Sequence, residues 1–303
     1  MGMPQALRPF AVTVNWNRAK DTLECVDSLL QGNPGTEVVV VDNGSTDGSS
    51  ALLRERHPDL TVIENPSNLG YVRGVNLGIR LALEKGATHV LMINNDALAH
   101  PGMVGDLLEL FGREPSAGIA GPKIFYYGTD LMWFNGGHFN DLLGFSTHPL
   151  MDRRDDGGDQ EREVHYITGC AMMVRSEVFR EVGLFDEDFE IYAEDLDLCL
   201  RAKEKGFSSW LVPQATAEHK VSLSTGVVGT NLMTPYRSYY YGRNMLIVVR
   251  KRMKGGRFVT GFLGQTLILL PYYFMLIKMQ KSHGSFSKYL KGYAHALVWM
   301  VRS

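Results

Sequence analysis

The run Asn94-Asn95-Asp96 is the first place in this sequence where the residue types could do chemistry. It follows the apolar stretch 90–93, so its carboxylate is expected at the end of a buried strand. A carboxylate there can coordinate a divalent cation that a diphosphate also holds, because Mg²⁺ and Mn²⁺ take few protein oxygens and keep phosphate oxygens. Taken alone, the run is more typical of a turn whose Asn and Asp side chains make local hydrogen bonds.

A second candidate is the pair Glu194-Asp195, in the most acidic stretch of the chain. The pair opens a predicted helix over 193–205, where the helix dipole favours carboxylates, so a structural role for each stays open. A carboxylate next to a bound diphosphate could also take the proton from an attacking hydroxyl. Asp197 and Arg201 stand four residues apart and are expected to pair on the helix surface.

Three further side chains suit nucleotide or metal binding. Asp42 follows the apolar run 38–41 and could accept a hydrogen bond from a ribose hydroxyl or a base, although it is equally suited to cap the next helix. Arg73 lies between two glycines that open a predicted helix, where free N–H groups and positive charge can meet phosphate. His219 is a candidate metal ligand, although a lone histidine is more often structural.

The elements that must position these residues alternate between short apolar runs and helical stretches. The pattern predicts strands over 10–14, 37–42, 60–64 and 89–94, and helices over 21–30, 49–56 and 74–85. Continuous apolar strands between helices predict a mainly parallel sheet covered on both faces, a doubly wound α/β architecture. Ligands bind at the carboxyl ends of such strands, so the polar residues 15–17, 42–44 and 94–96 are expected to converge there.

Composition limits the class of protein. A chain of 303 residues with 45% hydrophobic and 21% charged residues is typical of a globular protein, with room for one large α/β domain and an appendage. Three scattered cysteines without CxxC spacing argue against a disulfide framework or a zinc knuckle and suit a reducing compartment. Residues 1–10 lack a basic stretch followed by an apolar core, so no signal peptide is expected and the catalytic part should face the cytosol.

Charge is distributed unevenly along the chain. No Asp or Glu follows Glu218, whereas 13 of the 31 Lys and Arg do, which leaves 18 basic against 33 acidic residues upstream. A basic tail of this kind could meet nucleic acid, anionic lipid or an acidic substrate. Within it, residues 258–277 carry no formal charge, which is the minimum length for a membrane span. Two glycines and Pro271 favour instead a buried or interfacial helix pair that breaks at the proline.

The motifs resemble those of the family 2 glycosyltransferases with the GT-A fold, and within them the bacterial rhamnosyltransferase-like and galactofuranosyltransferase-like branch. The resemblance covers about residues 10–244. It implies a GT-A catalytic domain over 1–235 and a basic, apolar helical segment over 236–303 that associates with membranes. Six motifs carry it in this order: Val-Asn-Trp-Asn17, Val-Val-Asp-Asn-Gly-Ser-Thr-Asp47, Asn-Leu-Gly-Tyr-Val-Arg-Gly-Val-Asn76, Asn-Asn-Asp96, Gly-Leu-Phe-Asp-Glu-Asp-Phe189 and Glu-Asp-Leu-Asp-Leu-Cys-Leu-Arg201.

The resemblance also implies roles for individual residues. Asp96 is the expected ligand of Mg²⁺ or Mn²⁺, and His219 is expected to complete the metal shell. Asn94 stands where the family's DXD motif begins, an amide in place of a carboxylate that lowers the negative charge around the cation. The residues expected to contact the donor are Val14, Asn15, Asn17, Asp42, Asn43, Asn68, Arg73, Asn76, Asn94 and Asn95.

On the acceptor side, Asp195 resembles the catalytic base and Glu194 resembles a residue that lines the site. Gly169 and Cys170 are expected to line it too. Arg243 is expected to meet an acceptor phosphate, with plain helix packing as the alternative. No nucleophilic side chain is needed, because a single displacement inverts the anomeric centre.

The activity that follows is inverting transfer of a hexose from a nucleotide-sugar to an acceptor hydroxyl, for cell wall or polysaccharide biosynthesis. The branch favours L-rhamnose from dTDP-rhamnose, with a UDP-sugar as the alternative donor. The acceptor is expected to be linked to a polyprenyl diphosphate or to be a polysaccharide. The enzyme is expected to be cytoplasmic and peripheral on the inner face of an anionic cell membrane, without a nucleic-acid partner.

Two other classes of protein remain as alternatives. A nucleotidyltransferase would normally carry a glycine-rich loop after its first strand, whereas residues 15–18 here are Asn-Trp-Asn-Arg. A non-enzymatic lipid- or nucleic-acid-binding module would account for the basic tail but not for the carboxylates expected at the sheet edge.

Overall fold

The computed structural model describes residues 6–221 and 233–302. The strands are β1 (Pro9–Asn15), β2 (Glu37–Asp42), β3 (Thr61–Glu64), β4 (His89–Ile93), β5 (Ala97–Ala99), β6 (Ala117–Tyr126), β7 (Met132–Phe134), β8 (His138–Asn140), β9 (Phe145–Thr147), β10 (Arg162–Val164), β11 (Ala171–Arg175) and β12 (Ser208–His219). The helices that accompany the sheet are α1 (Ala19–Gly32), α2 (Ser49–Arg56), α3 (Tyr71–Glu84), α4 (Met103–Arg113), α5 (Ser176–Val182) and α6 (Glu194–Glu204).

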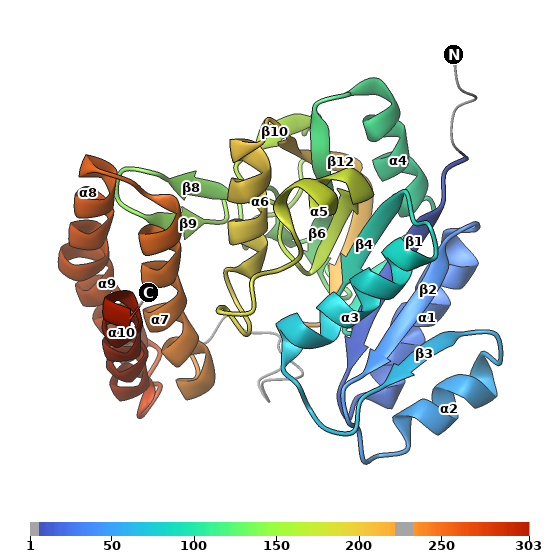
Figure 1. Cartoon of the computed structure of the whole chain (residues 1–303), viewed down its shortest axis with the longest axis horizontal. Helices are drawn as coiled ribbons and strands as arrows, with labels where there is room; N and C mark the ends of the chain where they lie inside the picture. Colours follow the sequence, from blue (N-terminus) through green and yellow to red (C-terminus); the bar gives the residue numbers. More distant parts are fainter. Residues whose placement is uncertain (1–5, 222–232, 303) are drawn as a thin grey trace.

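One mixed sheet organises this part of the chain, in the order β10-β12-β6-β11-β4-β1-β2-β3. The strands β4, β1, β2 and β3 are parallel neighbours, as the sequence predicts, and β11 runs antiparallel between β4 and β6. Helix α3 packs closely on the parallel half, because a Cβ on Gly78 would lie 2.3 Å from a methyl group of Val12. The predicted α/β class and the mainly parallel core are confirmed (Figure 1).

Strand register brings the predicted polar ends together. Asn15 lies directly opposite Asp42 where β1 and β2 end, and β4 lies on the other side of β1. At a more distant place in the sequence, β5 pairs with the end of β12, and His219 lies opposite Ala97. Residues 123 positions apart therefore meet at one edge of the sheet.

The C-terminal part is a separate group of helices beside the sheet, drawn in orange and red in Figure 1. It consists of α7 (Pro235–Arg252), α8 (Gly256–Gly264), a π-turn η2 (Gln265–Leu269), α9 (Leu270–Met279) and α10 (Ser285–Arg302). Thr234 caps α7 and Pro235 occupies its first turn. Helices α7 and α10 lie in close contact, because a Cβ on Gly242 would meet the carbonyl oxygen of Tyr289 at 2.3 Å. The predicted domain boundary falls in the first turn of α7 and stays a prediction.

The predicted break at Pro271 is wrong. Residues Gly256–Met279 form one continuous helical stretch, in which η2 directly precedes α9 and its proline. Proline cannot donate to the helix ladder, and the wider hydrogen-bond ring of a π-turn is one way in which a helix absorbs such an interruption. Among the described residues, this is the one helical stretch long and apolar enough to cross a membrane. Its most apolar 18-residue segment has a mean hydropathy of 1.4, and 28% of that segment is buried.

Candidate active site

Asn15 and Asp42 form the centre of a hydrogen-bonded network at the ends of β1 and β2. The Asn15 amide donates to Asp42 Oδ2 at 2.8 Å and to the Ser45 hydroxyl at 3.0 Å. The Ser45 main-chain N–H donates to Asp42 Oδ1 at 2.8 Å, and Asn15 Oδ1 accepts from Thr22. Both Asn15 and Asp42 are buried. Asn17 extends the network by accepting from the main-chain N–H of Thr46 at 2.8 Å.

Asn43 builds the loop that precedes α3. Its amide donates to Asn68 Oδ1 and to the carbonyl of Gly70, both at 3.0 Å. Its Oδ1 accepts from Asn65 and from the main-chain N–H of Leu69. These predicted donor-binding residues are thus brought together, and their side-chain bonds go largely to one another.

The other predicted donor residues lie around this network. Arg73 is exposed and forms an ion pair with Glu187 at 3.1 Å. Asn76 is buried, and its side chain exchanges hydrogen bonds with the main chain of Phe185 at 2.9 and 3.1 Å. Asn76 therefore joins α3 to the loop 183–189. Asn95 donates to Thr22, and Val14 lies partly buried in β1.

Asp96 and His219 are the expected metal ligands, and they are in contact. Asp96 Oδ1 lies 3.1 Å from His219 Nε2, and both side chains are buried. Burial alone would raise the pKa of Asp96, but the charge and hydrogen bond of His219, together with a main-chain hydrogen bond and Lys220, hold the pKa below the usual value. Burial alone would lower the pKa of His219, yet Cys170 and Asp96 raise it to about 10. Burial raises the pKa of the Cys170 thiol as well, so the thiol is neutral near pH 7. At that pH, Asp96 is therefore the charged group that raises the pKa of His219.

This pair suits a divalent cation that takes some of its ligands from the protein and the others from a diphosphate. The described residues contain no group of three or more His, Cys, Asp and Glu side chains that could hold an ion without help. Mg²⁺-type cations are typically held by one or two carboxylates and by substrate phosphates, so two protein ligands suffice. The buried Nδ1 of His219 has no hydrogen-bond partner among the described residues, so this nitrogen can still serve as a ligand or a donor.

Glu194 and Asp195 differ in their surroundings although they are adjacent. Asp195 is half-buried, and its two oxygens accept from the main-chain N–H groups of Gly169 at 2.9 Å and Leu196 at 2.7 Å. Burial raises the pKa of Asp195, and these hydrogen bonds oppose the rise. Glu194 is only 5% exposed, and its Oε2 has no partner among the described residues. Burial, followed by the charge of Asp195, holds the pKa of Glu194 well above its usual value.

The loop that delivers these carboxylates is strained and is held by α7. Glu190, Tyr192 and Ala193 have φ angles of 60°, 65° and 69°, the left-handed region that residues other than glycine rarely adopt. The side-chain NH2 of Asn244 lies within hydrogen-bond distance of the carbonyls of Phe189, Ile191 and Tyr192, at 2.9, 2.7 and 2.8 Å. It has two N–H donors, so one of them is shared between two of these carbonyls. A residue of the C-terminal helices therefore fixes the entry to α6.

The two remaining predicted acceptor-side groups have clear positions. Gly169 lies directly beside the pair, since a Cβ there would be 3.6 Å from Glu194 Oε1, and the carbonyl of Cys170 accepts from the N–H of Asn94. Arg243 donates to the carbonyl of Asp188 at 2.7 Å and to Asn244 Oδ1 at 2.8 Å. Its guanidinium also lies 3.8 Å from Glu190. These contacts correspond to the packing alternative for Arg243.

Sequence reasoning assigned no role to Asn244 or to Arg237, which lies two turns earlier in α7. A buried asparagine in the middle of a helix is a signal for the first, because asparagine is a poor helix former and needs a partner there. No comparable signal exists for Arg237, because its lack of a carboxylate partner is visible only once the chain is folded.

Comparison with known proteins shows the family of the chain. Residues 10–183 match the family described as Glycosyl transferase family 2. The N-acetylglucosaminyl-diphospho-decaprenol L-rhamnosyltransferase of Mycobacterium tuberculosis is 31% identical over 218 residues, which cover 66% of this chain and 71% of that protein. The dTDP-rhamnosyl transferase RfbF of Shigella flexneri is 26% identical over 249 residues, 80% of each chain.

Solved structures share the fold at low sequence identity. The mannosyltransferase PcManGT of Pyrobaculum calidifontis, in complex with GDP-Man and Mn²⁺, has a TM-score of 0.60 at 16% identity over 96% of this chain and 87% of its own. Residues 1–349 of S. aureus TarS give 0.59 at 13% identity, over 94% and 81%. The chain therefore belongs to glycosyl transferase family 2, as a glycosyltransferase with a GT-A fold and rhamnosyltransferase-like relatives.

Proposed function

We propose that this glycosyltransferase inverts the anomeric centre in one displacement, with Asp195 as the base. The observation that carries the proposal is the contrast between the two adjacent carboxylates. Asp195 is half-buried, and its carboxylate accepts from two main-chain N–H groups that favour its charged form, whereas Glu194 is buried, lacks a partner for Oε2 among the described residues and has its pKa held well above the usual value. The more exposed and more readily ionised carboxylate is the better placed to accept a proton, so we assign the base to Asp195.

The step conserves atoms and charge. The acceptor oxygen bonds to the anomeric carbon while the bond from that carbon to the nucleoside diphosphate breaks, and the hydroxyl proton passes to an Asp195 oxygen. Asp96 and His219 would hold Mg²⁺ or Mn²⁺ together with the donor diphosphate, and the cation would supply positive charge against the leaving group. Asn15, Asp42 and the loop built by Asn43 would shape the nucleotide site.

The relatives favour a rhamnosyl donor. Two of them carry names that specify rhamnosyl transfer, one from a dTDP-sugar and one to a sugar on decaprenyl diphosphate. L-Rhamnose from dTDP-rhamnose, moved to a hydroxyl of a lipid-linked or polysaccharide acceptor in cell-envelope synthesis, is therefore our first assignment. A UDP-sugar is the second, because TarS has also been solved with UDP.

A donor screen tests the activity. Wild-type protein would be mixed with dTDP-rhamnose, UDP-sugars or GDP-mannose, Mn²⁺ and a polyprenyl diphosphate-linked sugar, and the released nucleoside diphosphate would be measured. Asp195→Asn should lower turnover by about 10²- to 10⁴-fold while nucleoside diphosphate binding stays close to wild type. The neighbouring substitution Glu194→Gln is the matched control, and its turnover should fall by a smaller factor. Near-normal turnover of Asp195→Asn would refute the assignment of the base.

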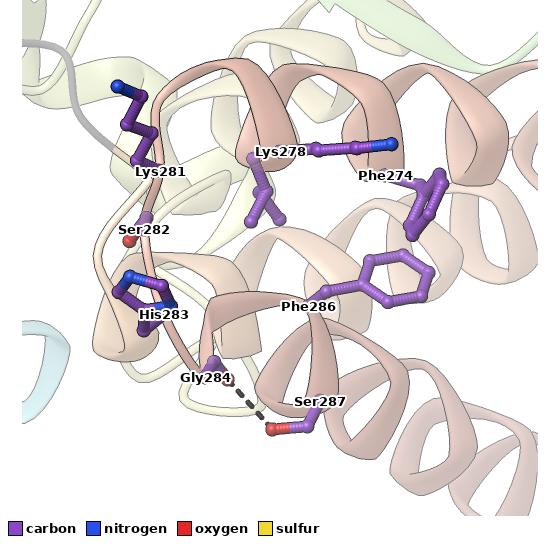
Figure 2. Close-up of a pocket in the computed structure, with 9 residues that line it drawn as sticks. Phe274, Lys278, Lys281, Ser282, His283, Gly284, Phe286 and Ser287 are labelled. Carbon is purple, nitrogen blue, oxygen red and sulfur yellow. Dashed lines mark hydrogen bonds between the residues drawn. The ribbon is translucent and has the colours of Figure 1, made fainter.

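We also propose that the C-terminal helices place the enzyme on an anionic membrane surface. The helical stretch Gly256–Met279 exposes a row of large apolar side chains, among them Leu267 at 67% and Met279 at 76%. Figure 2 shows a surface pocket of about 480 Å³ at the turn between α9 and α10, whose lining includes Phe274, Lys278, Lys281, His283 and Phe286. Exposed apolar and aromatic residues next to lysines suit an interface with anionic lipid.

Part of the basic charge has another use. Lys251 pairs with Asp186 and Asp188, and Arg252 pairs with Asp197 at 2.6 Å. These cations bind the helices to the acidic catalytic part, so fewer than the 13 are free to meet lipid. Attraction to a surface is worth about 1 kcal/mol for each nearby Lys or Arg before screening.

Flotation with liposomes tests this location. The protein should float with vesicles that contain anionic phospholipid at low salt, and less so at high salt, because the charge attraction is screened. Vesicles of neutral lipid are the control for the apolar contribution. Absence of flotation with anionic vesicles at both salt concentrations would refute the proposal.

A further inference from the structure

Arg237, near the start of α7, has no acidic partner. Its guanidinium donates to the Tyr241 hydroxyl at 3.2 Å and lies 5.3 Å from the centre of that ring and 6.0 Å from the centre of the Tyr192 ring. Within 6–221 and 233–302 it forms no ion pair, and its Nε is buried without a hydrogen-bond partner. The residues outside these ranges include no Asp or Glu, so no acidic side chain there can complete the pair.

Two other arginines of the same helix do have an acidic partner. Arg243 and Arg252 each contact a carboxylate, Glu190 and Asp197 respectively. A cation removed from water costs free energy unless an anion or hydrogen-bond acceptors replace the water. Contacts with tyrosine rings recover part of that cost, because the ring face attracts cations, but among the described residues they leave the buried Nε–H without an acceptor.

Arg237 lies on the side of the molecule that holds the catalytic carboxylates. Tyr192, against which it packs, precedes Glu194 by two residues and belongs to the strained loop. Burial, and then the positive charge of Arg237, lower the pKa of His148 to about 4. The ring of His148 lies 5.9 Å from the ring of Tyr166, a residue near enough to Asp195 to respond to its charge. Arg237 therefore packs on the loop that leads directly into α6, the helix that carries Asp195.

We propose that Arg237 binds a phosphate group of the acceptor whose hydroxyl is presented to Asp195. A planar guanidinium with free N–H groups matches phosphate oxygens in geometry and charge, and the Tyr241 hydroxyl beside it is a further donor. The inference rests on the proposed transfer to a phosphate-bearing, lipid-linked sugar. It gives Arg237 the role that the sequence suggested for Arg243, whose guanidinium is already occupied.

Kinetics with a matched pair of acceptors test the site. One acceptor would be N-acetylglucosamine on a prenyl diphosphate, and the other an octyl N-acetylglucosaminide without phosphate. Arg237→Gln should raise KM for the diphosphate acceptor by at least about ten-fold and leave KM for the neutral acceptor and for the donor within two-fold. Arg237→Lys, which keeps the charge but not the fork of N–H groups, should lie between wild type and Arg237→Gln.

Arg250→Gln is the matched control, because it removes the same charge from an exposed position of the same helix. This variant should leave the KM of both acceptors unchanged. An equal rise in the KM of the diphosphate acceptor in Arg250→Gln and Arg237→Gln would mean that only the net charge of α7 matters, and would overturn the site. An equal rise in KM for both acceptors in Arg237→Gln would also overturn it, because that result indicates a general structural role.

A binding measurement separates this site from the proposed activity. With the donor site saturated by nucleoside diphosphate and Mn²⁺, farnesyl diphosphate would be titrated calorimetrically, with farnesol and inorganic diphosphate as separate arms. Arg237→Gln should weaken the binding of farnesyl diphosphate at least ten-fold and leave the binding of farnesol unchanged. If the binding of inorganic diphosphate depends on Arg237 to the same extent, the contact belongs to the phosphate and not to the lipid. Binding that depends on Arg237 without sugar transfer would support the site and refute the proposed function. Transfer without any dependence on Arg237 would do the reverse.

Discussion

The two sides of the candidate site differ in how completely their polar groups are satisfied. On the donor side, Asn15, Asp42 and Asn43 bond to one another and to nearby loops. On the acceptor side, Glu194 Oε2 and Arg237 Nε are buried without hydrogen-bond partners among the described residues. A satisfied network is rigid before its ligand arrives, whereas unsatisfied buried groups lower stability until a ligand or a proton compensates them. We therefore expect substitutions on the donor side to affect donor KM, and those on the acceptor side to affect turnover or the KM of the acceptor.

The largest effect in this comparison is expected where the two sides meet, at Asp96. Asp96→Asn keeps the shape but removes the negative charge that faces His219, so the cation should lose a ligand. We expect kcat/KM to fall by at least about 10²-fold. Calorimetric titration of a nucleoside diphosphate with and without Mn²⁺ provides the measurement. Stimulation by Mn²⁺ equal to that in wild type would show that Asp96 is not a ligand.

A paired experiment at two buried asparagines addresses the comparison directly. Asn244→Ala removes the NH2 group whose two N–H donors hold the left-handed loop, at about 1 kcal/mol for each donor, and should lower kcat about ten-fold with donor KM nearly unchanged. Asn43→Ala removes a similar number of bonds on the donor side and should raise donor KM more than it lowers kcat. Both variants should melt at a lower temperature. The same pattern of kcat and KM in both would remove the distinction between the two sides.

The pH dependence of stability tests the unsatisfied carboxyl. Burial and Asp195 raise the pKa of folded Glu194, so its contribution to stability is fully present below the unfolded pKa and is lost as pH rises through the folded pKa. Glu194→Gln, which cannot ionise, should therefore be more stable than wild type at pH 8 and similar to it at pH 4. A gain of about 1 kcal/mol would raise the melting temperature by about 2 °C. A difference in melting temperature that stays constant between pH 4 and 8 would contradict the prediction.

The smallest effect is expected at the exposed pair Arg73 and Glu187 on the donor side. Arg73→Gln should lower stability by less than about 1 kcal/mol, because both side chains are solvated. If Arg73 faces the donor diphosphate, donor KM should rise several-fold, and Arg80→Gln, which alters the same acidic partner, should leave it unchanged. Urea unfolding and donor kinetics provide the two measurements. Equal donor KM in both variants would leave Arg73 with a surface role only.

The sequence predicts the donor side better than the acceptor side, and the reason is the range of the interactions. Asp42 and Asn94 follow apolar strands directly, so local pattern places them at the sheet edge. His219 reaches Asp96 only through the pairing of β5 with β12, and the resemblance rather than any local pattern pointed to it. The left-handed residues before α6 are not glycines, so nothing in the sequence marks the strain there.

The C-terminal helices illustrate a second limit. Pro271 is a strong local signal for a break, but the π-turn before it absorbs the missing hydrogen bond and the helix continues. The sequence also does not show which basic residues bind carboxylates within the chain, as Lys251 and Arg252 do, and which face outward. Such pairings depend on how the helices meet the loop at 186–193.

The segregation of charge along the chain has a consequence for the way the protein approaches a surface. Thirteen cations and no acidic side chain follow Glu218, while 33 acidic and 18 basic residues precede His219. A negatively charged membrane would attract one end of such a molecule and repel the other, and so would exert a torque before contact. Lys and Arg keep their charge below about pH 10, whereas carboxylates lose theirs near pH 4. On acidification the torque should weaken while the attraction grows, so the protein would bind more tightly but with a less uniform orientation.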